Sequence, residues 1–138
     1  MNIDYKKPIT VRTAAAVTTS YVAGTVIGAE TTDKTMTNEY NQLILNIAIT
    51  KASLTSIELK VEFSPDNTTW YRESHEKLDN GTGTIYPLEY SITASSLGTT
   101  ENVRLPIQIN DRYVRVSVKG TGTVTSSSVG ITATLGVN

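Results

Sequence analysis

Strict two-residue alternation of apolar and polar side chains runs through four segments of the chain. In residues 57–63 the odd positions are apolar and the even positions are charged. Apolar side chains again occupy every second position in residues 103–109, 114–118 and 129–135. Such a period is typical of a β-strand with one buried and one solvated face. The pattern therefore predicts four half-buried strands.

Other apolar segments depart from simple alternation. Residues 43–49 are apolar on both faces, which indicates a central strand covered on both sides, or a strand with one face covered by a partner chain. Residues 21–27 form a weaker strand candidate because Gly24 interrupts them, and Trp70-Tyr71 and residues 85–90 complete the set. Pro106 cannot donate to a ladder, so residues 103–109 are expected at a sheet edge or at a bulge.

Turn sequences separate these strands. Ser64-Pro65-Asp66-Asn67 places proline where a type I turn favours it, and Asp79-Asn80-Gly81 is a strong hairpin signal. No segment has a convincing helical period. Short strands with such turns predict an all-β protein, a two-sheet β-sandwich of which a jelly roll is one form. The shared phase predicts one inter-sheet core containing Leu59, Val61, Trp70, Leu105, Val114, Val116 and Ile131.

The chain of 138 residues fits one domain. Within it, residues 1–40 contain few large apolar side chains, whereas residues 41–138 carry the alternating strands and form the expected sandwich body. Residues 1–40 can be interpreted in two ways. They are either an extended arm that packs on a neighbouring chain, or a first strand or two with a long loop at residues 31–34.

Composition and charge narrow the function classes. The net charge is −1, which lacks the basic excess expected of a nucleic-acid or membrane surface. With no cysteine, disulfides and thiolate chemistry are excluded. The first residues lack the apolar run of a signal peptide, and no segment is long enough for a membrane span. We expect a protein made in a cytoplasm, without nucleic acid or membrane as a partner.

The candidate catalytic residues all have simpler explanations. His75 is the single histidine and lies in a polar stretch, beside a Ser74 that has no Gly-x-Ser-x-Gly elbow. One histidine without cysteine does not make a zinc site. The carboxylate pairs Glu58/Glu62 and Glu73/Glu76 are interspersed with cations, as on a solvated strand face. We therefore predict no enzyme activity, no catalytic, cofactor-binding or metal-binding residues, and no cofactor.

An aromatic cluster allows a different binding function. Trp70, Tyr71, Tyr86 and Tyr90 could form a platform on which sugar rings stack, which would make the chain a carbohydrate-binding module based on Trp70 and Tyr71. The alternative is that Trp70 anchors the core after a tight turn while Tyr71 lies at the sheet rim.

One stretch carries a family resemblance. Residues 58–71, an alternating strand followed by Ser-Pro-Asp-Asn-Thr-Thr-Trp-Tyr, resemble a hairpin that recurs in small β-sandwich proteins of tailed bacteriophages. Residues 110–118 resemble the strand that usually follows it. The two similar regions cover about residues 41–75 and 101–136, and residues 1–40 lie outside them.

The resemblance implies a virion structural protein and brings no catalytic residue with it. Its leading form is a capsid decoration, or cement, protein that binds the major capsid protein as a homotrimer on the capsid surface. A tail, fibre or connector component is the alternative within the virion. Both readings place the chain in the virion after synthesis in the host cytoplasm.

Overall fold

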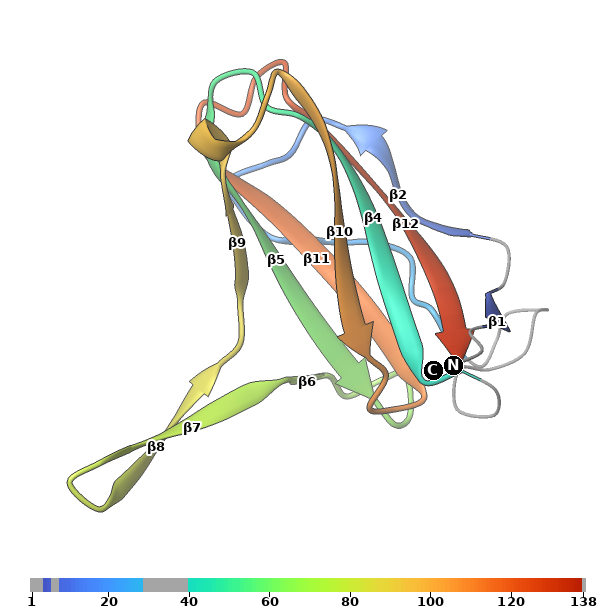
Figure 1. Ribbon diagram of the computed structural model, residues 1–138, viewed down its shortest axis with the longest axis vertical. Coiled ribbons are helices and arrows are strands. Elements are labelled where there is room, and N and C mark those ends of the chain that lie inside the picture. The colour runs from blue at the N-terminus through green and yellow to red at the C-terminus, as the bar shows by residue number, and fades with distance from the viewer. Residues whose placement is uncertain (1–3, 6–7, 29–39, 138) are drawn as a thin grey trace.

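The computed structural model describes residues 4–5, 8–28 and 40–137. They form two antiparallel sheets packed face to face, with a separate hairpin that projects from one corner (Figure 1). The first sheet contains β1 (Asp4–Tyr5), β2 (Ile9–Ala15), β12 (Ser128–Val137), β4 (Gln42–Thr50) and β10 (Thr100–Gln108). The second contains β3 (Val22–Ala23), β11 (Tyr113–Gly122), β5 (Leu54–Ser64), β6 (Tyr71–Arg72) and β9 (Tyr90–Thr93). The hairpin consists of β7 (Ser74–Asp79) and β8 (Thr82–Pro87), and one short 3-10 helix, η1 (Ala94–Ser96), follows β9.

The strand pairing is nested from the ends of the chain inward. β2 pairs with β12, β3 with β11, β4 with β10 and β5 with β9. The inner neighbours β12–β4 and β11–β5 then complete the two sheets. A long hairpin rolled up in this way is a jelly roll. The predicted two-sheet sandwich is confirmed.

The core lies between the sheets and follows the predicted alternation. On β5, Ile57, Leu59 and Val61 are buried, whereas Glu58 and Lys60 lie on the outer face. Central strand β4 is buried on its inner face and at Ile44 on the other, while Ala48 is exposed. β10 lies at the edge of the first sheet, as Pro106 predicts.

Two predicted core residues are less buried than expected: Trp70 lies outside the inter-sheet core, and Leu105 packs against the core but is only partly buried. Tyr71 is the cross-strand partner of the inward-facing Phe63, so the two-residue alternation places Trp70 on the outer side of the sheet. Trp70 is half-buried there, with the Arg115 guanidinium 4.4 Å from its ring centroid. Leu105 is also only half-buried, because it belongs to edge strand β10.

The described part of residues 1–40 contributes to both sheets. β2 pairs with β12, β3 pairs with β11, and Val11 and Val17 are each 2% exposed. Gly24 lies where the chain crosses close to β2, and a Cβ atom at this position would be 2.6 Å from the carbonyl oxygen of Val11. The loop expected at residues 31–34 lies outside the described residues.

Candidate functional site

The projecting hairpin, residues 74–87, interrupts an edge strand of the second sheet. β6 and β9 both pair with the same edge of β5, where Arg72 lies opposite Glu62 and Tyr90 lies opposite Leu59. Only the positions opposite Lys60 and Val61 separate the two pairings. The hairpin is therefore an insertion into one discontinuous strand, and it leads away from the sandwich (Figure 1).

The turn of the projecting hairpin has the geometry that its sequence predicts. Asp79 pairs with Thr82, which leaves Asn80 and Gly81 as a two-residue turn. Both residues have positive φ, at 51° and 80°. A type I′ turn requires positive φ at both positions and matches the twist of the flanking strands. The register of the hairpin is thus set by its own turn.

The two faces of the projecting hairpin differ in polarity. Leu78 lies opposite Gly83 and Ile85 lies opposite Glu76, so Leu78 and Ile85 are diagonal neighbours on one face. Their exposures are 72% and 70%. Pro87 extends this face toward the body. The apolar face is therefore displayed to solvent.

The opposite face of the projecting hairpin is polar and aromatic. His75 pairs with Tyr86, and their rings stack with centroids 5.6 Å apart. The next pair on this face is Lys77 with Thr84. His75 is exposed, as predicted for a surface histidine, and its described ring contact is with Tyr86. The hairpin is thus amphipathic. Such alternation is typical of strands that cover one face and leave the other to solvent.

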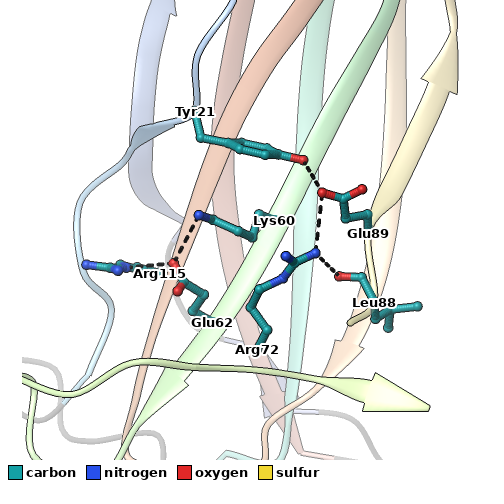
Figure 2. A network of polar contacts seen from close by, with 7 residues as sticks. All are labelled: Tyr21, Lys60, Glu62, Arg72, Leu88, Glu89 and Arg115. Carbon is teal, nitrogen blue, oxygen red and sulfur yellow. Dashed lines mark hydrogen bonds and ion pairs between the residues drawn. The ribbon is translucent and has the colours of Figure 1, made fainter. Parts of the chain in front are cut away.

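Hydrogen bonds fix the base of the projecting hairpin to the second sheet (Figure 2). The Leu88 N–H donates to the carbonyl oxygen of Glu73 at 2.7 Å. Arg72 donates through Nη2 to the carbonyl oxygen of Leu88 at 3.4 Å, and the same atom lies 3.3 Å from Oε1 of Glu89. The phenol of Tyr21 donates to this Oε1 at 3.0 Å. Leu88 and Glu89, the two residues between β8 and β9, are therefore held on both sides.

Two cations also lie close to the ring of Tyr21. Nζ of Lys60 is 4.8 Å from the ring centroid, and Nζ of Lys119 is 4.7 Å away. Burial raises the pKa of Tyr21 to about 12, and the hydrogen bond to Glu89 adds to this effect. The phenol therefore stays protonated and keeps donating to Glu89 well above neutral pH.

A second charged group lies lower on the same outer face. Nε of Arg115 donates to Oε1 of Glu62 at 3.0 Å, and Nζ of Lys60 lies 3.9 Å from that oxygen (Figure 2). The Glu62 side chain is only 10% exposed, so its charge needs these partners. The Arg115 guanidinium also covers one face of the Trp70 ring. This leaves Trp70 and the 60%-exposed Tyr71 poorly placed to share one sugar platform.

An apolar cleft opens at the side of the sandwich where the two edge strands β9 and β10 lie. Its volume is about 220 Å³. Half-buried apolar side chains and one arginine line this side cleft, namely Tyr90, Ile92, Val103, Leu105 and Arg104. Ile47 and Leu59 form its floor. Neither edge strand has a further strand beside it among the described residues at this opening.

Sequence reasoning anticipated some of these residues and missed others. It identified the Asn80-Gly81 turn and the surface position of His75. It did not identify the apolar face of the projecting hairpin, although the alternation of Leu78 with its polar neighbours was available as a weak signal. In the part of the chain that the structure describes, no group of three or more His, Cys, Asp or Glu side chains is placed to hold a metal ion. No helix of the described residues could cross a membrane.

No protein-family model and no curated protein sequence matches the chain. One similar solved structure is a chain from Desmodium yellow mottle tymovirus, with 13% identity and a TM-score of 0.37. The alignment covers 99% of this chain and 81% of that one. A TM-score this low does not establish a shared fold, so the function must be inferred from the residues of this chain.

Proposed function

We propose that this chain is a structural protein of a tailed-bacteriophage virion, and that it acts as a capsid decoration protein bound to the major capsid protein. The observation that carries the proposal is the projecting hairpin, which displays Leu78 and Ile85 outside the jelly-roll body. The two side chains are diagonal neighbours, so they offer contiguous apolar surface of the kind that association sites use. We infer that the hairpin is a contact element in an assembly.

The phage-like segment supports the virion class. Residues 58–71 resemble the phage hairpin, and here they form the later part of β5, the turn after it and the start of β6. Asp66 organises the turn, because its Oδ1 accepts hydrogen bonds from the N–H groups of Thr68 and Thr69, both at 2.9 Å. Jelly rolls occur in capsid proteins, lectins and small-molecule enzymes, so the fold by itself does not identify the function.

The experiment is to purify virions of the phage that encodes this chain and to measure its copy number by quantitative mass spectrometry. A decoration protein is expected in a fixed ratio to the major capsid protein. Cryo-electron microscopy should then place a jelly-roll density on the outside of the head. Virions without the chain would overturn the proposal.

A tail, fibre or connector component is the second candidate, and copy number separates it from decoration. A few copies located at the tail or at the portal vertex would favour it. A carbohydrate-binding module is less well supported, because Arg115 already occupies one face of the Trp70 ring. Glycan-array binding that is lost in Trp70→Ala and Tyr71→Ala would reverse this order.

A further inference from the structure

The apolar face of the projecting hairpin needs a cover that its own chain does not provide. An isolated two-stranded hairpin is marginally stable in water. This one shows burial at none of the residues 74–87, and its two large aliphatic side chains, Leu78 and Ile85, are more than two-thirds exposed. A partner surface that buries them would stabilise the hairpin as well as the contact.

The side cleft has the matching chemistry. It is lined by half-buried apolar side chains, and β9 and β10 at its rims present free strand edges among the described residues. An extended or two-stranded segment can bind such an opening through side chains and main chain together. Every copy of the chain thus carries both an apolar projection and an apolar opening.

The charges of the two surfaces are also complementary. Glu76 lies beside Ile85 on the apolar face of the projecting hairpin, and Arg104 lies at the rim of the side cleft. Both side chains are exposed, and within the described residues neither forms a hydrogen bond or an ion pair. Glu76 on the hairpin and Arg104 at the cleft therefore favour the docking register that brings these two side chains together.

A hairpin cannot readily reach the cleft of its own chain. Tyr90 in the cleft follows Pro87 after only Leu88 and Glu89. Hydrogen bonds from Arg72 and Tyr21 hold these two residues while the hairpin leads outward (Figures 1 and 2). Folding back would require breaking this base. The cleft of a second copy has no such restriction.

We propose that the projecting hairpin of one copy docks its apolar face into the side cleft of a second copy, with Glu76 facing Arg104 of that neighbour. This inference deepens, and rests on, the assembly role proposed for the chain. Donor and acceptor are different surfaces, so the contact closes either as a head-to-tail ring or as a two-fold exchange of hairpins. A ring of three copies would be the homotrimer expected from the sequence.

The first test is the oligomeric state of the purified full-length chain, measured by analytical ultracentrifugation over a range of concentrations. The wild type should form a discrete oligomer. Leu78→Ser with Ile85→Ser should shift it to monomer. A matched control on the polar face, Lys77→Ser with Thr84→Ser, should leave it unchanged. A wild type that stays monomeric, or an oligomer indifferent to the apolar-face change, overturns the proposal.

A charge exchange tests the register. Glu76→Arg and Arg104→Glu should each weaken association by about two- to fivefold, in the range of an exposed ion pair. The chain with both changes should recover most of the lost affinity. Single variants that weaken association without recovery in the double variant would show that Glu76 does not face Arg104, and this would overturn the assigned docking register.

A mixing experiment tests donor and acceptor separately. Joining Ser74 directly to Tyr90 removes residues 75–89 and preserves the two-residue phase of the edge strand. This variant keeps the cleft but lacks the hairpin, whereas Val103→Glu on one rim, or Ile92→Glu on the other, keeps the hairpin but impairs the cleft. Each should be monomeric alone, and their mixture should form a 1:1 heterodimer.

The outcomes separate this proposal from the virion role. Circular dichroism and thermal unfolding establish that each variant retains the sandwich before its assembly is interpreted, and Ile92→Glu serves if Val103→Glu does not fold. A mixture that forms no heterodimer overturns the hairpin–cleft contact. No virion is present in these assays, so an oligomer can form even if the chain proves absent from phage particles. Likewise, the chain can prove present in phage particles even if the hairpin–cleft contact does not form.

Discussion

Tyr21 donates its phenol hydrogen to Oε1 of Glu89 at 3.0 Å, which connects two segments 68 residues apart in the sequence. Tyr21 precedes β3, and Glu89 is the last residue before β9. The same Glu89 oxygen lies 3.3 Å from Nη2 of Arg72. The Glu89 carboxylate therefore connects three points of the chain: the segment before β3, the residue Arg72 before the projecting hairpin, and Glu89 itself after the hairpin. This contact holds the base of the projecting hairpin against the second sheet.

Tyr21→Phe should remove both the hydrogen bond to Glu89 and the phenol whose pKa is raised. The folded-state pKa of Tyr21 is raised from 10.0 to about 12. A raised pKa contributes stability that is complete below pH 10.0 and is lost as the pH rises through about 12. The wild type should therefore exceed Tyr21→Phe in free energy of unfolding below pH 10.0, and this difference should shrink between pH 10.0 and 12.

The measurement is urea unfolding at a series of pH values, together with phenolate absorbance. Subtracting the titration of Tyr21→Phe from that of the wild type isolates one phenol among seven tyrosines. A difference curve with its midpoint near 10.0 would contradict the expectation, because burial and the Glu89 hydrogen bond would then not favour the protonated form.

The Asp66 turn should weaken in acid. The N–H groups of Thr69 and Thr68, and then the Ser64 hydroxyl, lower the pKa of Asp66 from its usual 3.8. Its stabilisation is therefore complete above pH 3.8 and is lost as the pH falls through the lower folded-state value. Asp66→Asn should be less stable than the wild type above pH 3.8, and the difference should fade in stronger acid. A carboxyl ¹³C titration with a midpoint at or above 3.8 would refute this.

The same substitution at two leucines should separate core from projection. Leu59 is fully buried between the sheets, so Leu59→Ala should lower the free energy of unfolding by about 2–5 kcal/mol. Leu78 is 72% exposed on the projecting hairpin, so Leu78→Ala should change global stability by less than about 0.5 kcal/mol. Urea unfolding of dilute protein measures both. Similar losses at the two positions would show that the hairpin unfolds with the body.

Much of the sandwich could be predicted because its signals are local. Alternation over residues 57–63 and 114–118 identifies β5 and β11, and the structure pairs these strands with each other. Pro106 indicated an edge strand for the physical reason that it lacks a donor, and β10 is at an edge. Asn80-Gly81 identified a hairpin turn because few residues adopt positive φ readily.

What could not be predicted depends on long-range register. Nothing near Trp70 in the sequence reveals that Tyr71, rather than Trp70, pairs with Phe63, and this one-residue phase moves Trp70 out of the core. The sequence also gives no sign that Arg72 and Tyr90 pair with the same edge of β5, because 17 residues lie between them. The side cleft follows from that interrupted edge, so it too requires the structure.

Gly81→Ala should destabilise the projecting hairpin without destabilising the sandwich. Gly81 has φ of 80°, and an added Cβ would meet no atom within 4 Å, so the cost comes from backbone conformation alone. For a residue with a side chain this left-handed conformation costs about 1–2 kcal/mol. Asn80→Gly is the matched control, since glycine adopts the positive φ of that position without strain. Amide hydrogen exchange of monomeric protein should show faster exchange at Lys77 and Thr84 in Gly81→Ala but not in Asn80→Gly, with exchange of the β5 amides unchanged. If the β5 amides also exchanged faster, the hairpin would be part of the cooperative body, and its role as an independent docking element would lose its basis.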